Sequence, residues 1–333
     1  MAFTVALPEL YRSIDVAWND AIQRAQFVAQ ADAAKICLQQ QTARVEPLIQ
    51  GAGPDAKTRT VRVHWLNGCA ITTSSPTDEC VVATTELTDD KKDYAIDSYR
   101  ESSFTTSWKV HRTTPHQLNE TVAVGLLMAS KALDEHLSAQ YFAFLAANNG
   151  AHEYNPVIGS AGAGDVWEIP SADMTVDAMP QFILSATFAR FTNAFMIHGL
   201  NFWTERFKAG QYADNSDGKG ENNLFNQLPM FWDPIGASVA SVSDQSWLVN
   251  RSAVALATAN FFDMSPRDFA GNHRVYKIAS RNLPGVYYDV HEMETCTSDD
   301  MVLSYKLNVN YKYLLNPLGC ESTRTGVLQF AKV

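Results

Sequence analysis

The sequence predicts an α+β protein in which one long helix, an extended β region and a long two-stranded sheet occupy separate stretches of the chain. Apolar residues at a spacing of three to four across 115–149 indicate the helix. Apolar residues at every odd position across 301–315 indicate a strand, because side chains alternate faces with a period of two. Residues 171–280 mix both patterns, and we expect a second, α/β subdomain there.

The composition is that of a folded protein with a sizeable core. The chain has 333 residues, of which 46% are hydrophobic and 19% charged, and the low charge hints at surface buried in an assembly. Its net charge of −10 and the lack of a Lys/Arg cluster argue against direct binding to nucleic acid. No stretch approaches the ~20 apolar residues of a membrane helix, and MAFTVALPEL lacks the features of a secretory signal. We therefore expect no membrane partner.

The cysteines are odd in number and contain no CxxC pair, so we expect reduced thiols. A bridge between Cys69 and Cys80, or between Cys296 and Cys320, is the alternative; the fifth cysteine is Cys37.

The N-terminal part is expected to be helical and then irregular. Residues 13–44 are rich in Ala and Gln, and Asp32 interrupts their apolar stripe, while 45–54 is predicted to be a loop. The stripe consists of Ile14, Trp18, Ala21, Ala25 and Val28.

Residues 57–112 form a predicted β excursion with thin apolar content. Alternating apolar residues at 61–65 indicate a strand, and Asn67-Gly68 indicates a turn. A second strand is predicted at 80–87, a charged loop tip at 89–92 and an edge strand at 94–109. Because so few apolar residues cannot form a core of their own, this excursion should pack against another surface.

The long helix is predicted over 115–149. Thr114 is the expected N-cap, Gln117 completes a capping box, and Asn148-Asn149-Gly150 ends the helix. Its apolar stripe consists of Leu118, Val122, Leu126, Leu133, Leu137, Tyr141 and Phe144. The helix carries only the charges of Glu120, Lys131, Asp134 and Glu135. An exposed helix of this length normally carries more, so another surface should cover it.

The remaining elements complete the expected subdomains. Residues 151–175 read as a loop, 179–208 as apolar with helical spacing, 211–223 as a polar loop, and 247–262 as a strand running into an Ala-rich helix. Residues 286–296 are predicted to pair with 301–315 through a turn at 297–300, with one face of the long strand buried and the other wet.

No residue pattern indicates a catalytic, cofactor-binding or metal site. His291-Glu292 begins like HExxH, but Thr295 stands where the second histidine belongs. The segment 214–218 has no calcium-loop register, and 159–164 lacks both GxSxG and a P-loop lysine. His116 and Glu120 alone do not make a metal site. We therefore expect no enzyme, no cofactor and no structural metal.

The order of elements resembles the tailed-bacteriophage major capsid protein, the fold first seen in the lambdoid phage Hong Kong ninety-seven and shared with encapsulins. Two stretches carry most of the resemblance, VGLLMASKALDEHLSAQYFAFLAANNG and YKYLLNPLGCESTRTGVLQF. The resemblance implies an N-terminal arm at 1–50, an E-loop at 51–112, an A-domain at 171–280, and a P-domain made of 113–170 and 281–333. That P-domain would contain the spine helix 115–149 and the β-hairpin 286–317.

The resemblance also implies a function. Proteins of this family self-assemble as hexamers and pentamers into an icosahedral shell, in the host cytoplasm, that encloses double-stranded DNA without binding it specifically; portal and other head proteins are further partners. A neighbour's E-loop packs across the P-domain, which would explain the charge-poor helix and the core-poor excursion. The expected inter-subunit residues are Val61, Val63, Trp65, Tyr94, Tyr99, Phe104 and Trp108.

Two other functions stay open on the sequence alone. An encapsulin-like compartment shell would have the same fold and enclose cargo enzymes instead of DNA. A small-molecule-binding or hydrolytic α/β protein would have its pocket in 179–262. Particle size separates this last alternative from both shells, and particle contents separate the shells from each other.

Overall fold

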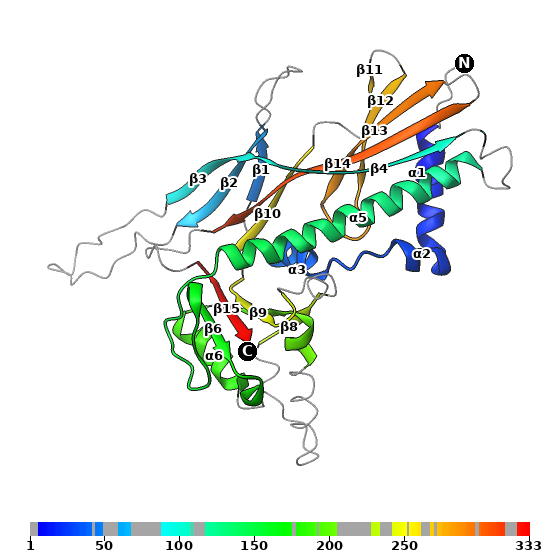
Figure 1. Cartoon of the computed structure of the whole chain (residues 1–333). Helices are drawn as coiled ribbons and strands as arrows, with labels where there is room; N and C mark the ends of the chain where they lie inside the picture. Colours follow the sequence, from blue (N-terminus) through cyan, green and yellow to red (C-terminus); the bar gives the residue numbers. More distant parts are fainter. Residues whose placement is uncertain are drawn as a thin grey trace. The chain divides into compact units, whose positions relative to one another are not determined.

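Helices and sheets are mixed along the chain, which confirms the predicted α+β class (Figure 1). The computed structural model describes residues 6–41, 44–48, 59–67, 88–107, 109, 117–174, 178–191, 193–204, 228–233, 242–251, 253–260, 267–269, 272–296, 300–316 and 325–333. The chain divides into two compact units. The first unit comprises Met1–Lys35, Ile96–Ala139 and Thr258–Lys312, and the second comprises Ile36–Ala95, Gln140–Ala257 and Tyr313–Val333.

The first unit is built from a sheet, a long helix and N-terminal helices. Its helices are α1 (Leu7–Asn19), α2 (Ala21–Phe27) and most of α5 (Leu118–Ala147). Its strands are β4 (Ser98–Ser107), β11 (Arg267–Phe269), β12 (His273–Ala279), β13 (Tyr287–Cys296) and most of β14 (Met301–Leu315). The sheet order is β10-β14-β13-β12-β11, where β10 is Val254–Ala259, and β4 pairs with β14.

The second unit contains two further sheets. Strands β1 (Arg44–Leu48), β2 (Arg59–Asn67) and β3 (Thr88–Ile96) form one of them. The other has the order β5-β6-β15-β9-β7-β8. Its strands are β5 (Ser160–Ala161), β6 (Val166–Ile169), β7 (Phe195–His198), β8 (Met230–Trp232), β9 (Gln245–Val249) and β15 (Val327–Lys332). Helix α6 (Ala178–Phe188), most of α3 (Asp32–Gln40) and the single 3-10 turns Ala163–Asp165 and Ser171–Asp173 complete the unit.

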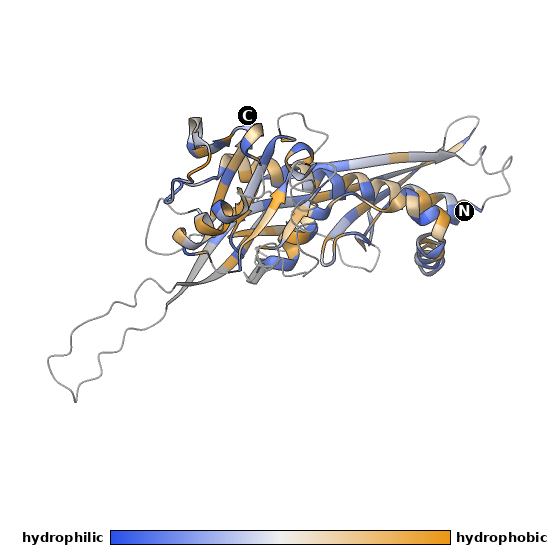
Figure 2. Ribbon diagram, turned by 90° about the horizontal axis from the view of Figure 1, so that it is seen from below, coloured by the Kyte–Doolittle hydropathy of each residue, from blue (hydrophilic) through white to orange (hydrophobic). Residues whose placement is uncertain are grey.

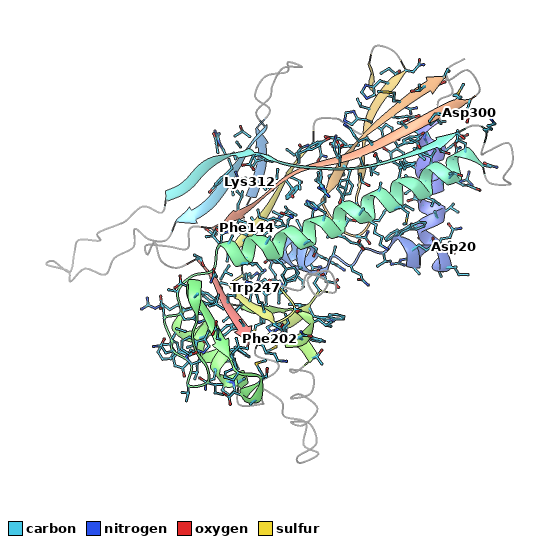
Figure 3. The ribbon with its side chains drawn as sticks, in the orientation of Figure 1. Asp20, Phe144, Phe202, Trp247, Asp300 and Lys312 are labelled. Carbon is cyan, nitrogen blue, oxygen red and sulfur yellow. The ribbon has the colours of Figure 1, made fainter. Side chains whose placement is uncertain are left out.

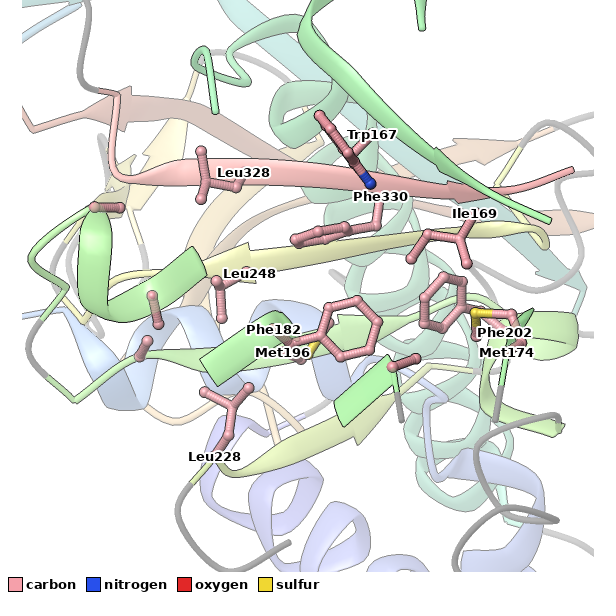
Figure 4. Packing of buried hydrophobic residues seen from close by; sticks show 14 residues of the cluster. Trp167, Ile169, Met174, Phe182, Met196, Phe202, Leu228, Leu248, Leu328 and Phe330 are labelled. Atoms are coloured by element: carbon pink, nitrogen blue, oxygen red, sulfur yellow. The ribbon is translucent and has the colours of Figure 1, made fainter. Parts of the chain in front are cut away.

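An aromatic and aliphatic cluster forms the core of the second unit (Figure 4). The ring of Phe330 on β15 meets Phe182 on α6 edge-on, with centroids 4.8 Å apart. Phe182 also contacts Phe202, whose centroid is 5.9 Å away. Such edge-to-face and tilted pairs add to the free energy of burying the rings. The sheet and α6 are therefore joined by ring packing.

Helix α5 is one continuous helix, as predicted, but it begins at Leu118 rather than at 115. The backbone N–H of Gln117 donates to Glu120 Oε2 over 3.2 Å, which is the reach-back half of a capping box. The expected cap Thr114 lies outside the described residues. At the other end, Asn148 Nδ2 donates to the carbonyl of Phe144 over 2.8 Å, where the helix has no further N–H to offer.

The apolar stripe of α5 is largely buried. Val122, Leu126, Leu133, Leu137 and Tyr141 are at most 1% exposed, whereas Leu118 and Phe144 near the two ends are half-buried. Another surface was expected to cover α5, and the chain's own N-terminal residues supply part of that cover. Lys131 Nζ donates to the carbonyl of Gln26 over 2.9 Å, and Glu135 Oε1 accepts from the Gln30 backbone over 3.4 Å.

The predicted C-terminal hairpin is confirmed. Strands β13 and β14 are antiparallel, from the pair Cys296 and Met301 to the pair Asp289 and Asn308. The expected wet face of β14 is only partly wet, because Asn308 and Asn310 are 6% and 2% exposed.

The prediction that residues 57–112 pack on a neighbouring subunit rather than on their own chain is wrong for 98–107. Strand β4 pairs with β14 along its whole length, from Ser98 with Tyr311 to Ser107 with Val302. The hydroxyl-rich sequence is compatible with this position, because backbone hydrogen bonds of a sheet require no apolar side chains. The charged tip expected at 89–92 is also wrong, since these residues lie inside β3.

The N-terminal region forms separate helices, although its apolar stripe predicted a continuous one. Asp20 ends α1 and caps α2, its Oδ1 accepting from the backbone N–H groups of Ile22 and Gln23 over 2.9 and 3.1 Å (Figure 3). The loop expected at 45–54 contains strand β1, which pairs with β2.

Two expectations for 171–280 are also corrected. The Ala-rich stretch after Trp247 forms strands β9 and β10 and no helix. Ala253, Ala255 and Ala257 are fully buried in this stretch, so the apolar pattern is continuous and does not distinguish strand from helix. Helical spacing across 179–208 is interrupted after Phe188, because β7 follows a reversal with positive φ at Arg190 and Asn193. Residues 200–204 are helical again.

Candidate assembly surface

The residues expected at subunit contacts occupy different environments. Val61 and Val63 are fully buried within the chain and are therefore not available to a neighbour, which corrects that assignment. Tyr94 is half-buried. The side chain of Trp65 and the whole of Trp108 lie outside the described residues, as does the strand expected at 80–87.

Phe104 belongs to the interior of the first unit. Its ring stacks on Tyr305 with centroids 5.0 Å apart and planes 12° apart. On α5, a Cβ at Gly125 would come within 2.3 Å of the Phe104 ring, so glycine is what allows this close approach. Phe104 therefore packs β4 against the sheet and helix of its own chain. Tyr99, on the same strand, is 47% exposed.

One face of the first-unit sheet is directed toward α5. Tyr288 on β13 donates its hydroxyl proton to Asp134 of α5, and Tyr311 on β14 is 2.9 Å from His136 of α5. Because side chains alternate along a strand, their sequence neighbours lie on the opposite face. We call this opposite face the outer face. It includes Tyr99, Glu101, Lys277, Tyr287, Asp289, His291, Met293, Lys306, Asn308, Asn310 and Lys312.

The outer face combines exposed apolar side chains with paired charges. Met293 is 49% exposed and Tyr287 36%. Lys306 Nζ lies 3.3 Å from Glu101 Oε2, and Lys312 Nζ lies 3.0 Å from Asp97 Oδ2. Figure 3 labels Lys312 and Asp300, which lie toward opposite ends of β14. These pairs neutralise charge where β14 meets β4, while the exposed apolar residues Tyr287 and Met293 lie on β13.

Hydrogen bonds and ion pairs shift carboxylates on this face toward the charged form. The Tyr99 hydroxyl and then Lys306 lower the pKa of Glu101, and the hydrogen bond from Lys312 lowers the pKa of Asp97. Both carboxylates are mostly exposed, so solvent screening makes each pair worth little to folding.

Two amides on the outer face lack partners. Among the described residues, Asn308 Oδ1 and Asn310 Nδ2 are buried without a hydrogen bond. A buried unpaired amide atom costs free energy, so these two atoms are a local cost within the sheet.

Further exposed apolar side chains lie on helices. Figure 2 colours the ribbon by residue hydropathy, and apolar and polar residues alternate along the helices. Val16 is 64% exposed and Ile22, on α2, is 82% exposed. On α6, Phe188 is 53% exposed and stacks on Tyr154 with centroids 4.9 Å apart. Single exposed apolar residues are common on protein surfaces, so these carry less weight than the outer face.

The residues weighed for chemistry have structural environments. Glu292 is buried in the sheet, 4.0 Å from Arg274, and burial raises its pKa. Across the described residues, no group of three His, Cys, Asp or Glu side chains is placed to hold a metal ion. Cys37 and Cys296 are free. Outside the described part lie Cys69, Cys80, Cys320, His116 and the whole of 211–223, which includes 214–218.

Among the described residues, no helix has both the length and the apolar character needed to cross a membrane.

Sequence reasoning missed a buried carboxylate in the first unit. Asp134 is fully buried, although it was counted among the few surface charges of α5. It accepts hydrogen bonds from Ser280 Oγ and Asn282 Nδ2, both over 2.9 Å, and from the Tyr288 hydroxyl. The available signal was its position between Leu133 and Leu137 of the apolar stripe.

The comparisons with known proteins found similarity in structure only. No family model matches the sequence, and no curated protein matches it. A chain of Mycobacterium phage Che8 is 12% identical with a TM-score of 0.45, covering 81% of this chain and 84% of that one. A chain from the mature capsid of bacteriophage PhiM1 is 13% identical with a TM-score of 0.42, covering 84% and 83%. A chain from the capsid of Ralstonia phage GP4 is 12% identical with a TM-score of 0.43, covering 81% and 82%.

Proposed function

We propose that this chain is a major capsid protein that self-assembles into the icosahedral shell enclosing the double-stranded DNA genome of a tailed bacteriophage. The observation that carries the proposal is the construction of the first unit. A continuous 30-residue helix covers one face of a sheet whose central strand β14 is 15 residues long. We infer that these elements correspond to the spine helix and long hairpin that the sequence resemblance implies.

The outer face of that sheet supports the proposed assembly. It presents exposed apolar residues such as Met293 and neutralised charge pairs. Paired charges lower the cost of removing water from the surrounding surface. We therefore propose that the outer face contacts a second copy of the chain.

The proposal includes a structural role without catalysis, cofactor or resident metal. Within it, 1–50 is the N-terminal arm, 51–112 the E-loop, 113–170 with 281–333 the P-domain, and 171–280 the A-domain. Hexamers and pentamers of this chain would build the shell, with portal and other head proteins as further partners. The net charge of −10 agrees with a shell that encloses DNA without gripping it.

Electron microscopy and sizing of the purified protein test the proposal. We expect capsomers or closed particles, and nuclease-protected DNA in particles taken from the native source. A monomer at assembly concentrations would contradict the shell, and particles filled with an enzyme cargo would contradict the virion.

A variant of the outer face tests where the contact lies. Met293→Arg should leave the subunit folded, because the side chain is half exposed, but should reduce particle yield. Met293→Leu is the matched control and should assemble normally, since it keeps an apolar side chain of similar volume. Normal particles from Met293→Arg would show that this part of the outer face is not a subunit contact.

A further inference from the structure

The N-terminal residues 26–35, which we call the arm segment, lie along one face of α5 in the first unit (Figure 1). Lys131 binds the carbonyl of Gln26, Glu135 binds the backbone N–H of Gln30, and Ser138 Oγ accepts from the backbone N–H of Ala34 over 3.3 Å. Positions spaced by three, four and seven share a helix face, so the arm segment follows this face for two turns.

Asp134 lies on the same helix face, between Lys131 and Ser138. Asn282 connects it to the arm segment: Nδ2 of Asn282 contacts both Asp134 Oδ2, at 2.9 Å, and the carbonyl of Phe27, at 3.3 Å. Asn282 Oδ1 in turn accepts from the backbone N–H of Ala29 over 3.0 Å. Asn282 therefore links the Asp134 carboxylate to the hydrogen bonds that hold the arm segment.

Neutral groups surround this carboxylate. Its hydrogen-bond partners are the hydroxyls of Ser280 and Tyr288 and the amide of Asn282. Ser280 is itself fixed, because its Oγ accepts from the backbone N–H of Leu283 over 2.9 Å. A buried carboxylate without a counter-charge is more stable when protonated.

The charged groups of the surrounding elements are engaged elsewhere. On α5, Lys131 binds Gln26 and Glu135 binds Gln30. Arg281, next to Ser280, pairs with Asp15 of α1. On the arm segment, Asp32 and Lys35 are exposed. Among the described residues, no cation is hydrogen-bonded to Asp134, and Glu135 adds a like charge nearby.

We propose that the arm segment is a proton-coupled latch: it docks on α5 with uptake of one proton by Asp134, so that acid tightens it and neutral pH loosens it. When the arm segment is docked, Asp134 is dry and favours the neutral acid. When the segment leaves, water reaches the carboxylate through the vacated face of α5, and the ionised form is solvated. Protonation and docking therefore favour each other.

The pKa agrees in direction with this geometry. Burial raises the pKa of Asp134 from 3.8 to about 6, against the lowering effect of the Tyr288, Asn282 and Ser280 hydrogen bonds. If undocking restores the ordinary value, the docking equilibrium gains about thirtyfold in total between pH 6 and 4, and about tenfold in total between pH 7.5 and 5.

Hydrogen exchange of the full chain measures this equilibrium directly. After correction for the intrinsic exchange rate, the amides of Ala29, Gln30 and Ala34 should be about tenfold better protected at pH 5 than at pH 7.5. Amides of β15 in the second unit serve as the internal control and should show no such gain. Equal protection of the arm segment at the two pH values, or lower protection at pH 5, overturns the latch in the unmodified protein.

Two matched variants assign the proton. Asp134→Asn, a neutral isostere, should be protected to the same extent at both pH values. Glu135→Gln, which alters the neighbouring α5 carboxylate that contacts Gln30 of the arm segment, should keep the tenfold response. A pH response that persists in Asp134→Asn, or disappears in Glu135→Gln, overturns the assignment to Asp134. If Asp134→Asn does not fold, Tyr288→Phe replaces it. Loss of that donor should move the midpoint of the response to higher pH, and an unchanged midpoint overturns the proposal.

Discussion

Both the middle of α5 in the first unit and the aromatic core of the second unit are buried, but polar groups dominate one region and rings dominate the other. Around Asp134, a carboxylate, two hydroxyls and an amide satisfy one another. Around Phe182, Phe202 and Phe330, the contacts are between ring faces and edges. Each region holds a helix on a sheet, by different means.

The difference determines what each region responds to. A polar network depends on the protonation state and on every partner being present, since one missing donor leaves a buried atom unpaired. A ring cluster depends on volume, because truncation leaves a cavity. Two histidines border this cluster, His152 against Phe330 and His198 against Phe202, and both contact it through their rings. The first unit should therefore be sensitive to pH, and the second unit to side-chain size.

The largest expected effect comes from placing a carboxylate one position away from the polar network. Leu133→Asp puts a buried charge where no donor is provided, at a side chain that is 1% exposed. The cost is several kcal/mol, comparable with the ~5–15 kcal/mol total stability of a domain, so the protein should not fold. Soluble yield and far-UV circular dichroism measure this, and Leu133→Met is the control, with a loss below about 1.5 kcal/mol. A normal spectrum from Leu133→Asp would contradict the burial of this stripe.

The next effect tests the ring cluster. Phe182→Ala should lower the free energy of unfolding by about 3–5 kcal/mol, because a fully buried ring is replaced by a cavity. The loss should be the same at pH 5 and pH 8. Urea unfolding at both pH values measures it, and Phe182→Leu should lose less. A loss that changes strongly with pH would mean that the cavity reaches His152, which packs against Phe330 and whose pKa is lowered by burial.

A smaller effect tests the polar network. Tyr288→Phe removes one donor from Asp134 and should cost about 1–3 kcal/mol at pH 8. Because the folded pKa of Asp134 is raised to about 6 from 3.8, its contribution to stability is fully present below pH ~4 and is lost as the pH rises through 6. The removed donor stabilises the ionised form, so the loss should be smaller at pH 5.

The matched control for this variant is a second buried tyrosine of the same sheet. The Tyr276 hydroxyl is buried without a hydrogen-bond partner among the described residues, so Tyr276→Phe should be nearly neutral or stabilising at either pH. Equal losses for Tyr288→Phe and Tyr276→Phe, or an equal loss for Tyr288→Phe at both pH values, would argue against a special role for the Asp134 network.

The elements that could be predicted are those whose own pattern has one clear period. Helix α5 and strands β13 and β14 are long enough for the spacing of apolar residues to identify them. Their ends were less certain, because the start of α5 at Leu118 depends on which residue supplies the cap.

The errors occurred where tertiary pairing decides the structure. The Ala-rich sequence of strand β10 is compatible with a helix as well as a strand. Pairing with β14 favours the strand. Strand β4 is too polar to reveal that it lies on its own sheet. The burial of Asp134 depends on Asn282 and Tyr288, which lie about 150 residues away in the chain, at separations of 148 and 154. No local pattern contains such a contact.

The smallest expected effect concerns the ion pairs of the outer face. Lys312→Ala removes the pair with Asp97, whose side chains are 31% and 67% exposed. Because water screens both charges, the free energy of unfolding should fall by less than about 1 kcal/mol, and 1 M salt should remove most of this difference. Lys306→Ala, which removes the similarly exposed pair with Glu101, should behave in the same way. Urea unfolding in low and high salt measures both. A loss above ~2 kcal/mol that salt does not reduce would mean that these pairs are buried in solution, as they would be if the outer face were already covered by a second copy of the chain.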